Sequence, residues 1–322
     1  MKKYLIAVFS ILSFTIISQN SEINVGLINV QFDSQNLSFF ESGTFSSKSV
    51  NINSKYSEYV SYSFGDTVYF CSTKNISSDN NKINIEKGKS FNSLFFAKKK
   101  RLNIWVKTKI VESFKNLNVC SICFTNDQSV AYITIDVSKE NENIEKENLK
   151  IYKVKIDNKG SIINSFELPF NSNEYSSGYP TISNDGKTIY FSSDRPGGFG
   201  GTDIYKATIF NDNTFGLPVN LGQKVNSEGN EVFPWITKDD NLFFSSDGLN
   251  GFGGLDIYFI HNEHGEWINL TNLGESLNSK QDDFGLILNK DEETGFFSSN
   301  RKGGKGDIDI YQFKIEKPFS FN

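Results

Sequence analysis

Carboxylate side chains flank three glycine-rich segments of the chain, and this arrangement has the most obvious potential for chemistry. The residues are Asp194 with Asp203, Asp247 with Asp256, and Asn300 with Asp307 and Asp309. Carboxylates around a glycine loop can hold Ca²⁺. The pattern recurs in step and lacks the spacing of an EF-hand, so turn capping through backbone N–H groups is the favoured interpretation. We therefore predict no metal and no other cofactor.

Serine pairs precede the same loops, at Ser192-Ser193, Ser245-Ser246 and Ser298-Ser299. Three equivalent copies indicate a structural repeat, because a nucleophile needs one special copy. The two histidines of the chain, His261 and His264, lie in an expected surface turn, which argues against a Ser-His-Asp triad. No pair of carboxylates stands out as a glycosidase site, which remains an open alternative. We predict no catalytic residues.

The glycine loops carry side chains suited to binding a partner. Arg195 and Arg301 occupy matching positions, with Gly248 between them in the middle loop, and Phe199 and Phe252 also match. Exposed Arg and Phe are common at the centre of protein interfaces. Ordinary loop chemistry is the alternative interpretation. The candidate binding residues are Asp194, Arg195, Phe199, Asp247, Phe252, Asn300 and Arg301.

The three cysteines, Cys71, Cys120 and Cys123, fall in expected strands of neighbouring units. Cys120 and Cys123 have CxxC spacing, but no second ligand pair or helix start accompanies them, so neither a zinc site nor a redox site is predicted. Buried thiols are the default expectation. One disulfide between units, involving Cys71, is the alternative in an oxidising compartment.

These residues belong to a repeat that predicts the fold. Asp-Ile-Tyr occurs at 203–205, 256–258 and 309–311, which is a spacing of 53 residues, and a Phe-Ser-Ser strand precedes each copy. Weaker copies contain Ile151-Tyr152 and Leu94-Phe95. An Asn-Ser pair followed by an acidic residue marks the start of a unit, as at Asn53-Ser54 and Glu58. Strand-rich units of this period are typical of a β-propeller. The count favours five four-stranded blades, with six as the alternative.

The N-terminal region differs from the repeats, which run from about residue 53 to 322. Residues 1–19 combine Lys2-Lys3 with a short apolar run and predict a secretory signal peptide. The propeller domain then covers 20–322. The last unit lacks an outermost strand, so we expect residues 20–50 to supply it and to close the ring, which removes an open sheet edge.

Composition narrows the possible partners. The net charge is −5, and the only basic cluster, Lys98–Arg101, is expected to be a solvated loop, so no nucleic-acid surface is predicted. Aromatic residues make up 14% of the chain, which suits tightly packed sheets. No stretch after the N-terminal segment has the length and hydrophobicity of a transmembrane span.

The string from Asn184-Asp185-Gly186-Lys187 through Phe191-Ser-Ser-Asp-Arg195-Pro-Gly-Gly to Asp203-Ile-Tyr205 resembles the WD40-like repeat of TolB-type propellers. It is most similar to the version in OmpA-family envelope proteins of gliding bacteria, some of which are linked to type IX secretion. The resemblance implies a non-catalytic, exported propeller that binds envelope or outer-membrane proteins. It implies a location in the periplasm, at the outer membrane or outside the cell. The sequence shows no helical repeat domain and no peptidoglycan-binding domain, so cell-wall anchoring is not expected.

A carbohydrate-binding or glycoside-processing propeller is the competing interpretation. A glycan would then occupy the glycine-loop side or the central channel. Such a site would place two or three carboxylates with shifted pKa values toward the channel.

Overall fold

The computed structural model describes residues 44–74, 92–100, 104–138, 148–157, 161–210 and 214–317. These residues belong to one compact unit, Phe40–Ser320. The expected signal peptide over residues 1–19 and residues 20–43 of the expected closing region lie outside the described residues.

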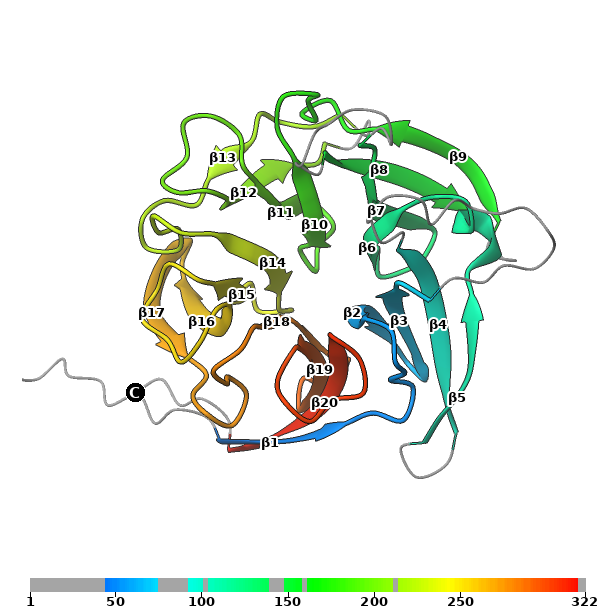
Figure 1. The fold of residues 1–322 in the computed structure, drawn as a ribbon. Helices are drawn as coiled ribbons and strands as arrows, with labels where there is room; N and C mark the ends of the chain where they lie inside the picture. The colour runs from blue at the N-terminus through cyan, green and yellow to red at the C-terminus, as the bar shows by residue number, and fades with distance from the viewer. Residues whose placement is uncertain are drawn as a thin grey trace, which may run out of the picture. The chain divides into compact units, whose positions relative to one another are not determined.

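Five four-stranded antiparallel sheets form the blades of a propeller (Figure 1). Blade 1 contains β2 (Glu58–Phe64), β3 (Thr67–Ser72), β4 (Ser93–Lys100) and β5 (Ile104–Ile110). Blade 2 contains β6 (Val119–Phe124), β7 (Val130–Asp136), β8 (Leu149–Ile156) and β9 (Ile162–Glu167). Blade 3 contains β10 (Ser177–Ile182), β11 (Thr188–Ser193), β12 (Asp203–Thr208) and β13 (Val219–Asn220).

The last two blades follow the same order. Blade 4 contains β14 (Glu231–Ile236), β15 (Leu242–Ser246), β16 (Asp256–Glu263) and β17 (Glu266–Asn272). Blade 5 contains β18 (Asp283–Leu288), β19 (Thr294–Ser299), β20 (Asp309–Lys317) and β1 (Thr44–Ser49). The innermost strands β2, β6, β10, β14 and β18 surround the axis, and each contacts the next, including β18 with β2 (Figure 1). The prediction of five blades is therefore confirmed.

The ring is closed by a strand from the N-terminal side of the repeats. β1 pairs antiparallel with β20 and completes the sheet order β1-β20-β19-β18 (Figure 1). Phe45 of β1 is buried and packs edge-on against Phe313, with 6.0 Å between ring centroids. Without β1, the outer edge of β20 would be unpaired. The expected closure is confirmed, and residues 44–49 provide it.

The repeated aromatic residues form cross-strand pairs inside the blades. Phe191, Phe244 and Phe297 lie directly opposite the Tyr of the Asp-Ile-Tyr motif on the next strand. The three ring pairs are stacked, with centroids 6.2, 5.8 and 5.4 Å apart. Stacked aromatic pairs across strands stabilise a sheet beyond the area they bury. The Asp-Ile-Tyr motif therefore marks the third strand of a blade, as predicted.

Two smaller features complete the fold. Lys98–Lys100, expected to lie in a loop, instead form the exposed end of β4. The pattern of charged side chains indicated exposure correctly but not the backbone conformation, because a strand that projects beyond its core remains solvated. A single 3₁₀ turn, Glu112–Phe114, is the only helical element among the described residues, which contain no helix long and apolar enough to span a membrane.

Asparagine side chains tie the connectors between blades to the blades they leave. In each case the amide accepts a hydrogen bond from the backbone N–H of an isoleucine on the third strand and donates one to its carbonyl. The pairs are Asn53 with Ile310, Asn171 with Ile151, Asn226 with Ile204 and Asn278 with Ile257. All eight distances lie between 2.8 and 3.1 Å. The asparagine thus gives the isoleucine N–H its partner and adds a second donor to the carbonyl, which also accepts a backbone N–H from the outer segment of the blade.

The asparagine contacts predict a specific loss of stability. Asn278→Ala leaves the buried N–H of Ile257 without a partner and its carbonyl with the Leu273 N–H alone, and this should lower the free energy of unfolding by about 1–3 kcal/mol. Asn250→Ala, at an exposed position of the same blade, is the control and should change it little. Urea titration of both variants measures the difference, and equal losses would contradict the role given to Asn278.

Closure by β1 gives a second prediction. Phe45→Ala removes a buried ring from the outermost strand of blade 5 and should destabilise the protein by about 3 kcal/mol. Lys48→Ala alters an exposed side chain of the same strand and serves as the control. Thermal and urea unfolding report the effect, and a Phe45 variant as stable as the wild type would show that β1 is not needed for the ring.

Candidate functional site

The glycine loops of blades 3, 4 and 5 lie at one end of the propeller, because each joins the second strand of its blade to the third. We call residues 194–202, 247–255 and 300–308 together the glycine-loop face. The corresponding loops of blades 1 and 2 fall largely within residues 75–91 and 139–147, outside the described residues.

The aspartate at the end of each loop holds the loop backbone. Asp203 accepts hydrogen bonds from the N–H groups of Phe199 (2.6 Å) and Gly200 (3.2 Å). Asp256 accepts one from Phe252 N–H at 2.5 Å, and Asp309 does the same for Lys305. Burial raises the pKa of Asp256, and the amide donors oppose that shift. The predicted capping role is thus observed directly.

The loop glycines allow close contact between blades. A β-carbon on Gly200 would lie 2.2 Å from the carbonyl oxygen of Gly229, in the connector to blade 4. The equivalent atom on Gly253 would lie 2.5 Å from the Gln281 carbonyl oxygen, and on Gly306 1.9 Å from the Tyr56 oxygen. Any side chain at these positions would push the blades apart. These three glycines are therefore explained by packing and do not indicate a phosphate site or another ligand site.

The first position of each loop is also engaged. Asp194 accepts a hydrogen bond from Ser176 N–H (2.6 Å), and Asp247 accepts one from Asn230 N–H (2.7 Å). Asn300 accepts one from Asp282 N–H (2.7 Å). Each donor immediately precedes the innermost strand of the same blade. The three predicted binding residues at this position therefore fix where their blade begins.

Arg195 is held inside a cage of aromatic rings. Its guanidinium carbon lies 4.9–5.9 Å from the centroids of four rings, those of Phe170, Tyr175, Phe191 and Tyr205. The group also donates hydrogen bonds to the hydroxyls of Ser193 and Ser177, at 3.1 and 3.2 Å. Burial lowers the pKa of Arg195. The cation–π contacts hold this side chain in the blade and limit what it can offer a partner.

Arg301 occupies the same place in blade 5 with a different partner. Its guanidinium lies over Phe297 and Tyr311, and it forms a 2.5 Å ion pair with Asp283, a fully buried carboxylate at the start of β18. It also donates to the carbonyl of Leu277. Blade 3 has Ser177 where blade 5 has Asp283, so only Arg301 of the two neutralises a buried charge.

The exposed rings on the glycine-loop face are those of Phe199 and Phe252. Their exposed fractions are 43% and 42%, and they occupy equivalent positions in neighbouring blades. In blade 5 the equivalent residue is Lys305, whose Nζ donates to the carbonyl of Asn53 at 3.2 Å. The structure thus brings two of the predicted binding residues to one end as exposed aromatic side chains on loops that aspartates hold in place.

Glu58 and Glu231, the acidic residues that begin β2 and β14, are buried and accept several hydrogen bonds. Glu231 accepts from Ser227 N–H (2.8 Å), Ser227 Oγ (2.5 Å) and Ser246 Oγ (2.6 Å). Burial raises the pKa of Glu231, and these serine contacts act against the shift. Glu58 makes the same contacts with Ser54 and Ser72. These two carboxylates join blades 1 and 4 to the connectors that precede them.

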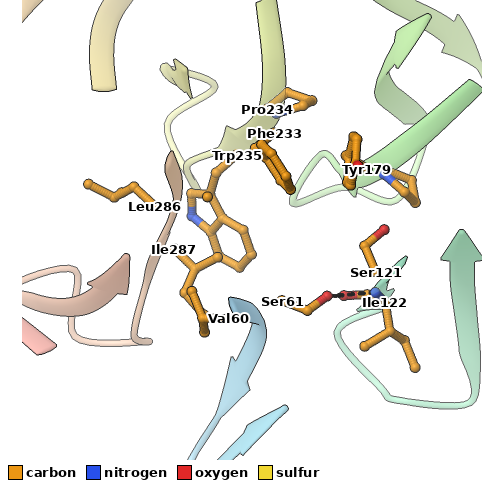
Figure 2. Close-up of a pocket in the computed structure, with 12 residues that line it drawn as sticks. Val60, Ser61, Ser121, Ile122, Tyr179, Phe233, Pro234, Trp235, Leu286 and Ile287 are labelled. Atoms are coloured by element: carbon orange, nitrogen blue, oxygen red, sulfur yellow. Dashed lines mark hydrogen bonds between the residues drawn. The ribbon is translucent and has the colours of Figure 1, made fainter. Parts of the chain in front are cut away.

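Apolar and aromatic side chains fill the axis of the ring (Figure 2). The axial cavity has a volume of about 30 Å³, and none of the described residues that line it carries a carboxylate. Tyr179 and Phe233 lie next to each other at its edge, with ring centroids 4.0 Å apart (Figure 2), and Phe284 lies 4.9 Å from Phe233. A space of this size holds one or two water molecules and excludes a sugar ring.

Sequence reasoning missed this aromatic closure of the axis. The innermost strands bulge at Tyr179, Phe233 and Gly285, where φ is 54°, 53° and 65°. A positive φ at a bulky residue is unusual and turns the ring toward the axis. The aromatic-proline pairs Tyr179-Pro180 and Phe233-Pro234, inside expected strands, were the available signal, because proline interrupts a ladder of hydrogen bonds.

The three cysteines are buried, and none of them forms a disulfide in the structure. Cys71 lies in β3 of blade 1, and Cys120 and Cys123 lie in β6 of blade 2, the strands expected for them. Burial raises the pKa of the Cys71 and Cys123 thiols, so both favour the neutral form.

No protein-family model matches the chain, and a search of curated proteins found no similar sequence. Comparison with solved structures shows the architecture. The fold is a β-propeller. A glycoside hydrolase matches with a TM-score of 0.50 and 10% identity, over 88% of this chain and 93% of its own. A protein solved as an RGII complex matches with a TM-score of 0.51 and 10% identity, over 87% of this chain and 92% of its own.

TolB from Acinetobacter baumannii is also similar, with a TM-score of 0.41 and 14% identity, over 78% of this chain. This chain spans about half of TolB, 52% of its length. Identities this low show a shared fold alone. The predicted β-propeller architecture is confirmed by the five four-stranded blades of the structure itself.

The two arginines give a matched test of the site. Arg301→Met leaves Asp283 buried without its cation and should lower the free energy of unfolding by about 3–5 kcal/mol. Arg195→Met loses contacts with rings and neutral groups and should cost about 1–2 kcal/mol. Urea unfolding of both variants measures the difference. Equal costs would show that the Arg301–Asp283 pair has no special role.

Proposed function

We propose that this chain is a non-catalytic β-propeller that binds another protein through its glycine-loop face. The observation that carries the proposal is the pair of exposed phenylalanines, Phe199 and Phe252, at equivalent positions of blades 3 and 4. Because the sequence predicts a signal peptide, we expect the partner in the cell envelope, at the outer membrane or outside the cell. A link to secretion or gliding machinery is part of the proposal.

Rigid aromatic side chains make strong anchors for binding. The backbone N–H groups of Phe199 and Phe252 are bonded to Asp203 and Asp256, and the neighbouring glycines pack against the next blade. Both loops therefore lose little conformational freedom when a partner binds. Aromatic residues on such a surface often contribute most of the binding energy of an interface.

The geometry of the ring supports a non-catalytic role. The axial cavity is too small for a substrate and lacks acidic side chains among its described lining residues. The carboxylates Glu58 and Glu231 at the start of innermost strands accept hydrogen bonds from serines, and the cavity that Glu58 lines has a volume of only about 20 Å³, which is too small for a sugar between a glycosidase pair. A central catalytic channel, one form of the carbohydrate hypothesis, therefore has little structural support.

Carbohydrate binding without hydrolysis remains the second candidate function. One observation favours it, namely a larger cavity of about 480 Å³ between blades 2 and 3, away from both the axis and the glycine-loop face. The likeness to a glycoside hydrolase concerns the fold alone and adds no support to this candidate.

Replacing both exposed rings should abolish partner binding without unfolding the propeller. In Phe199→Ser/Phe252→Ser, loss of two aromatic anchors should weaken the interaction at least roughly tenfold. Crosslinked pull-downs of tagged wild-type and variant protein, from the envelope fraction of cells that make the chain, compare recovery by quantitative mass spectrometry.

Leu217→Ser is the matched control, because Leu217 is 89% exposed and lies outside the glycine-loop face. It should recover the same partner as the wild type in the same amount. Undiminished recovery by the double phenylalanine variant, with both proteins equally folded, would contradict the proposed function.

A further inference from the structure

A cavity of about 480 Å³ opens between blades 2 and 3, at the end of the propeller opposite the glycine loops. It lies there because its rim is formed by the turns that join the first and second strands of these blades, residues 125–129 and 183–187. Its volume lies in the range of sites that hold small organic ligands. It is also far larger than the axial cavity, so it can accept one or two sugar rings.

A lysine lies deep in this cavity among aromatic rings. Lys153 of β8 is 8% exposed and stands directly opposite Tyr132 of β7 in the sheet register. Its Nζ atom lies 5.8 Å from the ring centroids of Tyr132 and Phe166 and 5.9 Å from that of Phe215. Burial lowers the pKa of Lys153. A cation so poorly solvated gains from an additional anionic neighbour.

The rim offers hydrogen-bonding groups on both sides. The two turns are joined by Asn126, whose Nδ2 donates to the carbonyl oxygen of Asn184 (2.8 Å) and to its Oδ1 (3.1 Å). Asp127 and Asp185 also lie on the rim, and hydrogen bonds, first of all from the Thr125 and Ser183 hydroxyls, lower the pKa values of these carboxyls. Their negative charges favour ligand hydroxyl donors at the rim, and the exposed ammonium group of Lys187, also on the rim, partly offsets them.

Aromatic walls complete the site. Tyr132 lines the blade 2 side, and Phe210, which is 51% exposed, lines the blade 3 side. Aromatic rings pack well against the apolar face of a sugar, while hydroxyls and carboxylates at a rim bond its hydroxyl groups. The cavity therefore combines an apolar wall, a polar rim and one deep positive charge.

We propose that this cavity binds a hydroxylated organic anion with a single carboxylate, of which a uronic acid unit is the simplest example. The carboxylate lies toward Lys153, and the hydroxyl groups face Asn126 and the carboxylates of the rim. This inference does not depend on partner binding at the glycine-loop face, because the two sites lie at opposite ends of the blades.

Calorimetric titration of the full chain with glucuronate, glucose and acetate tests the proposal. Glucose has the ring and hydroxyls without the charge, and acetate has the charge without the ring. Glucuronate should bind at least roughly tenfold more tightly than either. Galacturonate as a monomer and as an oligomer, in the same experiment, distinguishes a free sugar from the unit of a polysaccharide.

Three variants locate the binding. Lys153→Met keeps an apolar stem of similar length among the rings and should reduce glucuronate affinity to that of glucose. Lys153→Arg keeps the positive charge and should retain the preference for glucuronate. Phe210→Ser alters an exposed wall residue, so it should weaken glucuronate binding without affecting the fold.

The outcomes that overturn the proposal are equally specific. A failure of glucuronate to bind at concentrations up to about 10 mM would overturn the proposal. Equal affinity of the wild type for glucuronate and glucose would also overturn it. A folded Lys153→Met variant that still prefers glucuronate to glucose would contradict it as well. Unfolding midpoints of all three variants, measured alongside, establish that each is folded.

Discussion

The connector between successive blades is the constraint on which the rest of the propeller depends. In the connectors that enter blades 1, 4 and 5, an asparagine bonds to the third strand of the preceding blade, and the serine that follows bonds to the acid that begins the next blade, as Asn226 and Ser227 do with Ile204 and Glu231. The glycine loop of the preceding blade rests on the same connector, at Gly200. Three kinds of contact thus meet at one point, and together they fix the angle between neighbouring blades.

This arrangement determines which side chains remain for function. The acids, serines and glycines of the repeat serve the junctions between blades, and Arg195 and Arg301 are held by aromatic rings. These polar groups already have partners within the chain, and Phe199 and Phe252 are the large apolar side chains that the glycine-loop face exposes, beside charged residues such as Lys302 and Asp307. A surface with fixed aromatic anchors and few available catalytic groups favours recognition of a protein over chemical reaction.

Much of the fold could be predicted because the repeat is regular. The 53-residue spacing of Asp-Ile-Tyr gives the blade count, and the missing outermost strand after Tyr311 indicates closure from the N-terminal side. The capping role of Asp203 followed from its recurrence in three units. In each case the signal is local in sequence or repeats at a fixed distance.

The remaining features depend on contacts that the repeat does not encode. Arg195 is caged partly by Phe170 and Tyr175, which precede its own repeat strands. The axis is sealed because Tyr179 and Phe233 adopt positive φ, which an aromatic residue rarely does. The cavity around Lys153 arises only when blades 2 and 3 pack side by side. Such features combine residues from several elements, so spacing along the chain does not reveal them.

Site-specific photocrosslinking in cells that make the protein tests most directly the claim that the glycine-loop face binds a protein. A photoreactive phenylalanine analogue would replace Phe199 or Phe252 in turn, and Phe64, which is 39% exposed at the opposite end, would be the reference position. We predict that positions 199 and 252 crosslink to the same protein and that position 64 does not. Absence of crosslinks from both glycine-loop positions, or equal crosslinking from position 64, would contradict the account.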